Sequence, residues 1–212
     1  MTETLQQKLA ALPLLSRTPV EWGRAMMAEP LALLADHAFL EKKAAQNAME
    51  LLARWPDEFA DNGAAAWINI MTGIARDETA HLAQVTRLLQ RKGGQLGRGH
   101  SNPYAKALRE LVRRGTTHET TDRLFVSALI EARSCERFGV LAETATDEDL
   151  SAFYRALFSS ELGHYKAFLK LALKIKPVKK SEARWQEMLQ AEAEILAKQE
   201  PGVRMHSGFS SP

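Results

Sequence analysis

The sequence predicts an all-α protein, a bundle of four long helices with one long crossover and additional short helices. The chain has neither the alternating pattern of β-strands nor a hairpin turn signal, and Pro and Gly residues divide it into long uninterrupted segments. Of its 212 residues, 45% are hydrophobic, which is enough for one sizeable core. We therefore expect a single domain over residues 1–212.

Pro, Gly and capping residues set the expected limits of each helix. Thr18 is expected to cap a short helix that opens with Pro19 and Glu21. Short connections make the first and second core helices, and the third and fourth, antiparallel neighbours, with the crossover between the two pairs. The expected ranges are 2–11 and 19–29 for two short helices, about 30–55, 63–92, 119–145 and 147–175 for the core, 103–114 for a basic helix, and 181–199, capped by Ser181, for the last helix.

Composition excludes several classes of protein. Cys135 is the only cysteine, so an internal disulfide and a cysteine-based zinc site are both excluded. No apolar run reaches the length of a signal peptide or a membrane span. We expect a cytoplasmic protein with no membrane partner.

Positive charge is concentrated in two segments, although the net charge is only +2. Residues 87–114 carry eight basic side chains against one acidic one, and residues 166–184 carry seven against one. Such segregation is typical of proteins that bind a polyanion such as nucleic acid. The alternative interpretation is a solvated, lysine-rich face.

Two Glu-x-x-His motifs point to metal chemistry. Glu78 and His81 lie in the second core helix, and Glu161 and His164 lie in the fourth. A step of three residues turns a helix by about 300°, so both side chains of a motif share one face and can bind one metal. One motif is weak evidence, but two at the centres of corresponding helices predict a metal pair. Carboxylate and imidazole ligands suit iron or manganese.

In an antiparallel helix pair, residues at equal distances from the connecting turn lie at the same level. This distance selects one further glutamate from each remaining core helix. Glu78 lies 15 residues after Gly63, and Glu41 lies 14 residues before Trp55, on the other side of the same turn. The same counting across the second turn selects Glu131. At about 1.5 Å per residue, each of these positions lies about 20 Å from its turn.

Two rival glutamates fit this counting less well. Glu50 and Glu136 stand closer to their turns than the metal-binding motifs do. Glu41 and Glu131 also lie in apolar stretches, where an unpaired carboxylate would be costly unless a metal binds it. The alternative is that these glutamates reach solvent or pair with a nearby basic residue.

Three more residues are expected near the metals. Asp77 is placed to accept the ring N–H of a ligand histidine from the fourth helix. Cys135 lies one turn after Glu131, and His37 lies one turn before Glu41, so both are candidates for lining the pocket. Their structural alternatives are an exposed carboxylate, a small buried hydrophobic residue and a buried structural histidine, respectively.

Several motifs extend over nearly the whole chain. They are Asp36-His37, Glu41-x-Lys43-Ala44-Ala45, Ala75-Arg76-x-Glu78-x-x-His81, Gln84-Val85, Ile130 to Phe138, Phe153-Tyr154, Ser160-Glu161-x-x-His164-Tyr165, Leu169 to Ala172 and His206-Ser207-Gly208. In these motifs the chain resembles the bacterial tRNA 2-methylthio-isopentenyladenosine hydroxylases, which belong to the ferritin-like di-iron group. The segment 130–138 is the most specific part. One departure is Leu40, where the family pattern would have a cysteine.

The resemblance implies a monooxygenase with two iron ions and dioxygen as co-substrate. It hydroxylates the isopentenyl group of the modified adenosine beside the tRNA anticodon and takes electrons from an external reductase. The ligands that it implies are the same six that the motifs and heights select, and no other catalytic residue is expected. Basic residues expected to contact the anticodon arm are Arg91, Lys92, Arg98, Arg109, Arg113, Arg114, Lys170 and Lys174.

Three alternatives remain open from the sequence. The first is a ferritin-like di-iron oxygenase for a small substrate such as a lipid or an aldehyde. The second is an iron-oxidising and storage protein, which would have to assemble into a shell. The third is a helical bundle without a metal. The sequence leaves the oligomeric state undecided.

Overall fold

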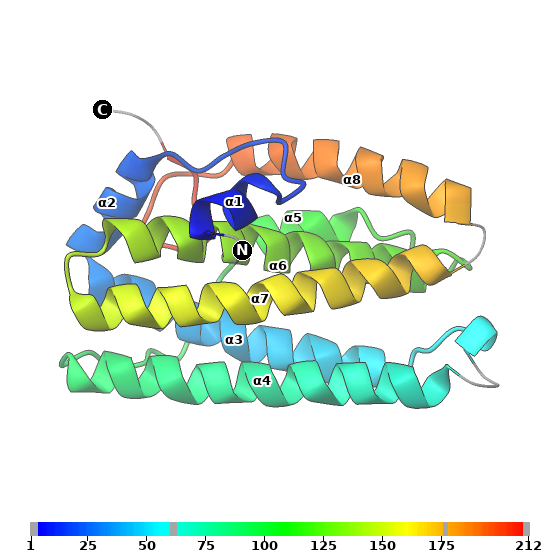
Figure 1. The fold of residues 1–212 in the computed structure, drawn as a ribbon, viewed down its shortest axis with the longest axis horizontal. Helices are drawn as coiled ribbons and strands as arrows, with labels where there is room; N and C mark the ends of the chain where they lie inside the picture. The colour runs from blue at the N-terminus through cyan, green and yellow to red at the C-terminus, as the bar shows by residue number, and fades with distance from the viewer. Residues whose placement is uncertain (1–3, 60–62, 176–177, 210–212) are drawn as a thin grey trace.

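The structure is a computed structural model that describes residues 4–59, 63–175 and 178–209. Within these ranges the fold is all-α, as predicted, and the only β-type pairing is an isolated bridge between Pro201 and Gly208 (Figure 1). The helices are α1 (Leu5–Ala10), α2 (Val20–Ala28), α3 (Pro30–Leu52), α4 (Ala64–Arg91), α5 (Pro103–Glu110), α6 (Glu119–Thr144), α7 (Glu148–Lys174) and α8 (Val178–Ala197), with a 3-10 turn at Asp57–Phe59.

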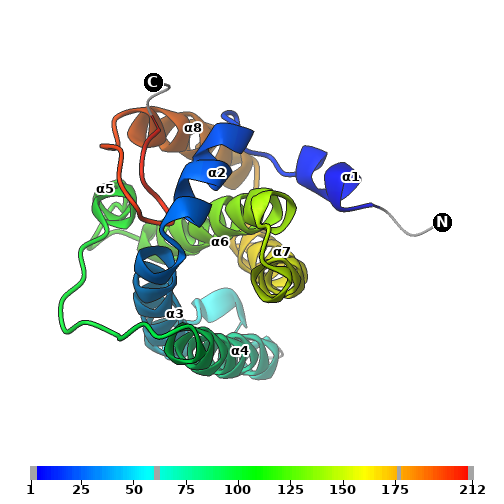
Figure 2. The ribbon, with the colours of Figure 1, turned by 90° about the vertical axis from the view of Figure 1, so that its left-hand side faces the viewer.

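Two antiparallel helix pairs form the bundle. Helix α3 packs along α4, α6 packs along α7, and α4 and α7 also touch (Figure 2). The observed limits of these four helices lie within three residues of the expected ones. Helices α1, α2 and α8 cover α6 on the side away from α4, and α5 lies against α6 and α8. The bundle therefore has one open side and one covered side.

The two ends of α6 show why the chain folds locally in this way. The connection to α7 is short, and the Asp147 side chain caps α7 by accepting a hydrogen bond from the backbone N–H of Leu150 at 3.0 Å. At the other end, the expectation that the basic helix runs to residue 114 is wrong, because α5 ends at Glu110. There the backbone N–H and guanidinium of Arg113 bind the buried carboxylate of Asp122 on α6, which pulls the chain out of the helix.

Two predicted caps are also wrong. Thr18 does not cap α2, since its backbone N–H and hydroxyl both donate to the Glu136 carboxylate, at 2.7 and 2.6 Å. Helix α8 begins at Val178, so Ser181 lies inside the first turn, where its hydroxyl donates to the carbonyl of Ile175 at 3.3 Å. In both cases the hydroxyl donates to an oxygen that lies outside the helix it was expected to cap.

A buried ionic network fixes the covered side of the bundle. The guanidinium of Arg133, on α6, donates to both carboxylate oxygens of Glu192 on α8, at 2.9 and 3.1 Å, and to Glu136 at 3.0 Å. The hydroxyl of Tyr104, on α5, also donates to Glu192, at 2.8 Å. Arg133, Glu192 and Tyr104 are completely buried. Helices α5, α6 and α8 are therefore tied to one another by charge-assisted hydrogen bonds.

Among the described residues, no helix is both long enough and apolar enough to span a membrane.

Candidate metal centre

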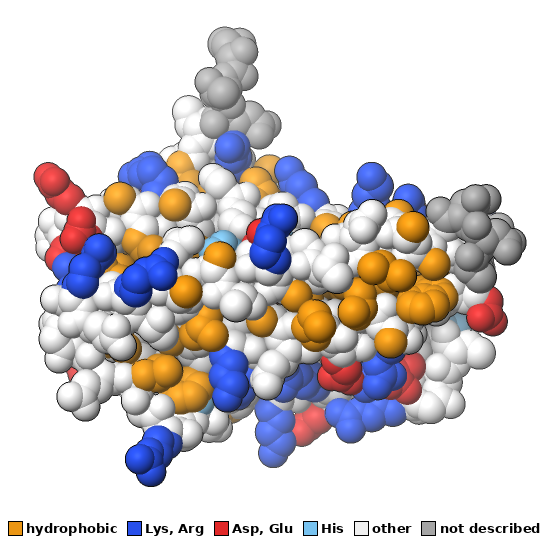
Figure 3. Space-filling view, turned by 90° about the horizontal axis from the view of Figure 1, so that it is seen from below, with side chains coloured by type: hydrophobic (Ala, Val, Ile, Leu, Met, Phe, Trp, Pro, Cys, Tyr) orange, Lys and Arg blue, Asp and Glu red, His pale blue; other side chains and the backbone are white. Residues whose placement is uncertain are grey.

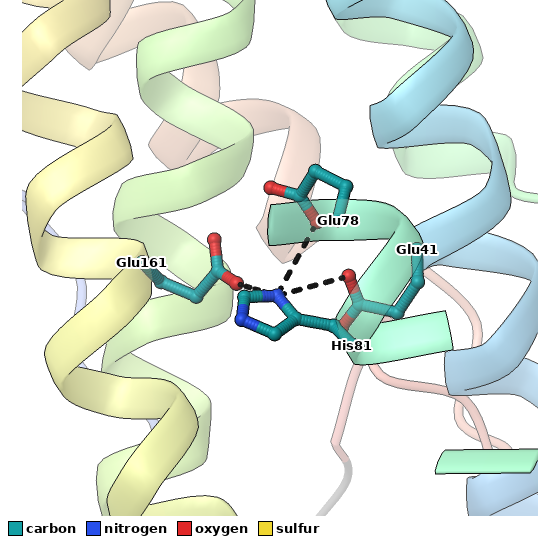
Figure 4. A group of neighbouring side chains, drawn as sticks. All are labelled: Glu41, Glu78, His81 and Glu161. Carbon is teal, nitrogen blue, oxygen red and sulfur yellow. Dashed lines mark ion pairs between the residues drawn. The ribbon is translucent and has the colours of Figure 1, made fainter. Parts of the chain in front are cut away.

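The structure brings together, at the centre of the bundle, all six side chains that the sequence selects as ligands. They come from α3, α4, α6 and α7, and none is more than 7% exposed. Their ligand atoms form two groups, in each of which all atoms lie within 4.8 Å of one another. The first group is Glu41, Glu78, His81 and Glu161 (Figure 4), and the second is Glu78, Glu131, Glu161 and His164.

Glu78 and Glu161 belong to both groups. The Nδ1 atom of His81 lies 3.1 Å from Glu161 Oε1 and 3.6 Å from Glu78 Oε2. The Nδ1 atom of His164 lies 2.7 Å from Glu78 Oε1 and 3.2 Å from Glu161 Oε2. Each of these carboxylates thus turns one oxygen to each imidazole. The sequence predicts one metal for each Glu-x-x-His motif, and nothing in it indicates that Glu78 and Glu161 belong to both groups.

The charges in the cluster need positive partners. Burial, together with the charges of Glu161 and Glu41, raises the pKa of Glu78 to about 8. Burial and the Glu161 charge raise the pKa of Glu131 well above its usual range. Burial alone would lower the pKa of His81, but the nearby carboxylates of Glu161, Glu41 and Glu78 outweigh burial and raise the pKa to about 12. Without metals, protons hold the cluster together, and two divalent cations would balance its four carboxylates.

Unpartnered atoms support the same fit. Among the described residues, the buried atoms Glu78 Oε1, Glu161 Oε1 and His81 Nδ1 lack a hydrogen bond of good geometry. Buried polar atoms without partners are costly, so they usually mark a missing water or ion. Carboxylate oxygens and imidazole nitrogens are also the ligand set that suits iron or manganese. The residues present therefore fit a metal pair.

The predicted neighbours of the metals lie close by, with different contacts. Asp77 Oδ2 lies 3.6 Å from His164 Nε2, while Arg76 donates to the other oxygen of Asp77 at 2.8 Å. The Nε2 atom of His37 is hydrogen-bonded to Oε1 of Glu41. Asp77 and His37 thus lie beside a candidate ligand each.

Cys135 is buried, and its thiol points elsewhere. The Sγ atom lies 3.4 Å from the carbonyl oxygen of Phe158, to which it donates. Cys135 is not among the residues that line the small cavity at the cluster, whereas Ser134 is. The structure therefore favours the interpretation of Cys135 as a small buried hydrophobic residue.

Two cavities lead to the cluster. An inner cavity of about 30 Å³ is lined by candidate ligands and by His37, Leu40, Ala44, Ile130, Ser134 and Phe138. An outer cavity of about 480 Å³, between α3, α5 and α6, ends at Glu131. Leu40, Ala44, Ile130 and Glu131 line both cavities. The outer cavity falls in the range of about 300–1,000 Å³ that is typical of ligand sites.

The wall of the outer cavity contains cations and amides. Its polar lining includes Lys43, Gln46, Asn47, Asn102, Arg109, Arg114 and Arg123. Arg123 is paired with Glu50 at 3.1 Å, but the described residues offer Arg109 and Arg114 no acidic partner. Sequence analysis missed Lys43, Arg123, Asn47 and Asn102, since nothing in the sequence places α3, α5 and α6 around one hollow.

The eight predicted RNA contacts do not form one surface. Arg91 and Lys92 lie at the end of α4, whereas Lys170 and Lys174 lie near the end of α7 at the opposite end of the bundle (Figure 1). Over the α4 face, Lys and Arg side chains are scattered among hydrophobic ones (Figure 3). Lys92 is bound to Asp147. Arg109 and Arg114 line the outer cavity, whereas the guanidinium of Arg113 is bound to Asp122.

The fold and the cluster together define the class. An all-helical bundle with two Glu-x-x-His motifs and two further glutamates in one buried cluster is a ferritin-like protein with a ligand set compatible with a metal pair. Within this class, the chain belongs to the family described as tRNA-(MS2IO6A)-hydroxylase (MiaE), whose model matches residues 5–207.

Two curated relatives carry the name tRNA 2-(methylsulfanyl)-N(6)-isopentenyladenosine(37) hydroxylase. The protein of Pseudomonas putida is 40% identical over 193 residues, which cover 91% of this chain and 90% of the relative. The protein of Salmonella typhimurium is 36% identical over 144 residues, which cover 66% of this chain and 52% of the relative.

A solved structure has the same fold. It is described as protein 43 with aldehyde deformylating oxygenase activity from Synechococcus, and it is 31% identical to this chain. The two superpose with a TM-score of 0.83 over 92% of this chain and 96% of the other.

Proposed function

We propose that this protein is a tRNA-modifying monooxygenase that hydroxylates the isopentenyl group of 2-methylthio-isopentenyladenosine beside the anticodon. The observation that carries the proposal is the outer cavity, which has cations in its wall and a candidate metal ligand, Glu131, at its inner end. Family membership supplies the substrate class. Because tRNA is the substrate, we expect the enzyme to work in the cytoplasm.

Iron would be held by Glu41, Glu78, His81, Glu131, Glu161 and His164. When bound and reduced, the iron pair supplies dioxygen activation, so that one oxygen atom enters a C–H bond of the isopentenyl group and the other leaves as water. This balance requires two electrons and two protons from outside. The sequence contains no flavin or iron–sulfur motif, so we infer an external reductase.

The chain's own residues position the substrate. Arg109 and Arg114, which line the outer cavity, would bind phosphates that flank the modified nucleotide. The base would leave the anticodon-loop stack and enter the outer cavity, as bases in single-stranded loops readily do. The apolar side chains of Leu40, Ala44 and Ile130 then surround the isopentenyl group and direct it to the inner cavity.

The direct test uses purified, iron-loaded protein with dioxygen, a reductant and tRNA that carries the unhydroxylated nucleoside. We expect the nucleoside to gain one oxygen atom, as measured by mass spectrometry of digested tRNA. Glu131→Gln should abolish this gain, whereas Glu143→Gln, an exposed glutamate on the same helix, should not. Unchanged tRNA with fully iron-loaded wild-type protein would refute the proposal.

A second function deserves a parallel assay because of the structural neighbour with aldehyde deformylating oxygenase activity. The same preparation is incubated with a long-chain aldehyde, and the alkane product is measured. The cationic wall of the outer cavity favours the nucleotide over an aldehyde chain, so we expect turnover of tRNA and none of the aldehyde.

A further inference from the structure

The C-terminal tail places a histidine between the two cavities. The backbone around His206 is fixed on both sides, since the N–H of Met205 donates to Asp36 at 2.8 Å and the Arg137 guanidinium donates to the carbonyls of Met205 and Ser207. His206 is only 4% exposed. Three hydrogen bonds therefore anchor the backbone on the two sides of the imidazole.

The contacts of His206 fix its tautomer. Oδ1 of Asn102 accepts the N–H of Ala105 at 3.0 Å as the cap of α5, so the amide NH₂ faces His206 Nδ1 at 3.1 Å. That nitrogen must accept, and the ring proton of the neutral imidazole is on Nε2. Burial and the charges of Arg137 and Arg133 lower the pKa of His206 well below its usual value, which keeps the ring neutral.

The tautomer determines the direction of the next hydrogen bond. Nε2 of His206 lies 3.2 Å from the hydroxyl of Ser134, on α6. Because Nε2 carries the proton, it donates to Ser134 Oγ, and the hydroxyl hydrogen of Ser134 must point elsewhere.

The inner cavity is the direction left for that hydrogen. Ser127, on the same helix, donates back to the carbonyl of Arg123 at 2.9 Å, but Ser134 has no such bond among the described residues. Ser134 instead lines the inner cavity beside Glu131 and Glu161. The cavity, at about 30 Å³, exceeds the roughly 10–15 Å³ that one water-sized molecule needs.

We propose that His206 acts as a positioning residue that holds Ser134 as a hydrogen-bond donor to a small anion or oxygen ligand in the inner cavity. This inference rests on the proposed metal centre, because the metals would bring such a ligand there. Asn102, His206 and Ser134 then form one chain of hydrogen bonds from the wall of the outer cavity to the inner one.

The first experiment needs no metal. Nitrogen NMR of metal-free protein labelled with ¹⁵N-histidine reports which ring nitrogen of His206 carries the proton. We expect protonated Nε2 and bare Nδ1 throughout the neutral pH range. The opposite tautomer would overturn the inference, since Ser134 would then donate to His206.

The second experiment titrates azide into iron-loaded, oxidised protein and follows the azide-to-iron absorption band. We expect Ser134→Ala to weaken azide binding about tenfold, because a hydrogen bond to a charged ligand is lost. His206→Gln keeps a donor near the Nε2 position and should retain the affinity, whereas His206→Asn does not reach Ser134 and should lose it. Ser151→Ala, which removes a hydroxyl at the α6–α7 turn, is the control.

The outcomes distinguish the proposed role of His206 and Ser134 from the proposed metal centre. Equal azide affinity in wild type and Ser134→Ala, with two irons bound in each, overturns the role of Ser134 and leaves the metal centre intact. If both amide variants at His206 lose affinity equally, the tail has only a structural role. If wild-type protein binds no iron, the metal centre fails and the inference fails with it. Thermal unfolding of every variant confirms that it is folded.

Discussion

The α3–α4 pair and the α6–α7 pair supply the same types of candidate ligand, but the two pairs have different surroundings. Each pair gives one glutamate and one Glu-x-x-His motif. Helix α4 packs mainly on α3 and α7 and leaves one face at the surface (Figure 3), whereas α6 is enclosed by α2, α5, α7 and α8. Metal binding thus needs one face of each helix, while the Arg133 network and the tail contacts are built on the enclosed pair.

The largest expected effect tests whether the α3–α4 pair contributes one carboxylate to both ligand groups and another to only one of them. Glu78→Gln removes a carboxylate shared by both groups and should lose both irons, whereas Glu41→Gln affects only the first group and should retain about one. Activity should fall more than about 100-fold in both variants. Iron per chain is measured by elemental analysis, with Glu143→Gln as control. A single iron lost from Glu78→Gln would contradict the shared arrangement.

The second prediction concerns the stability of the enclosed pair. Arg133→Met leaves Glu192 and Glu136 buried without their cation and should lower the free energy of unfolding by about 3–5 kcal/mol. Arg54→Met breaks an exposed pair with Glu50 on α3 and should cost less than about 1 kcal/mol. Urea unfolding followed by circular dichroism measures both. Similar losses in the two variants would show that the enclosure of α6 contributes little.

The third prediction concerns pH and the metal-free cluster. The pKa of Glu78 rises from 4.5 to about 8 on folding, and that of His81 rises from 6.5 to about 12. Between about pH 7 and 9 the folded state therefore holds more protons than the unfolded chain, so stability falls as pH rises over this window. At lower pH, His37 and His206 oppose this trend, because burial lowers the pKa of each. The pKa of Glu161 is lowered, and its contribution is lost only in acid, outside this window.

Iron loading should reduce this pH dependence, because metals replace the protons. Urea unfolding of the two forms at about pH 7 and pH 9 tests this, and iron binding at about pH 7 should release protons that a dye can measure. A metal-free protein that gains stability over this range would contradict the charge balance of the cluster.

The smallest expected effect compares the cavity mouth with the ends of the bundle. Arg109→Ala and Arg114→Ala should each weaken tRNA binding several-fold and reduce the dependence of affinity on salt by about one ion. Arg91→Ala and Lys174→Ala, far from the cavity, should have smaller effects. Fluorescence titrations over a range of salt concentrations measure all four. Equal effects would indicate RNA contact along the whole bundle.

The two antiparallel helix pairs were predictable from sequence. Helix periodicity and the distance from the connecting turn relate residues within one such pair. Glu41 and Glu131 were selected in this way, and the structure brings both to the cluster. The sharing of Glu78 and Glu161 was not predictable, since it depends on how close the two pairs approach each other. Spacing along one chain carries no information on that distance.

The segment before α2 and the C-terminal tail were less predictable for a related reason. Thr18 looked like a helix cap, but its partner Glu136 is 118 residues away. Pro201 and Gly202 interrupt regular structure before the tail, and no local pattern there signals that Met205 and Ser207 are almost completely buried. Contacts of this kind depend on the packed tertiary structure, and local residue preferences do not report it.

Leu40 lines both the outer and the inner cavity beside the candidate metal centre. We expect its side chain to limit the access of bulk water to the inner cavity, and an isopentenyl group would have to move it to enter. We therefore expect an enzyme that reacts slowly with oxygen until its RNA is seated. The electrons from the reductase would then be used for hydroxylation, and few of them would be lost in the formation of hydrogen peroxide.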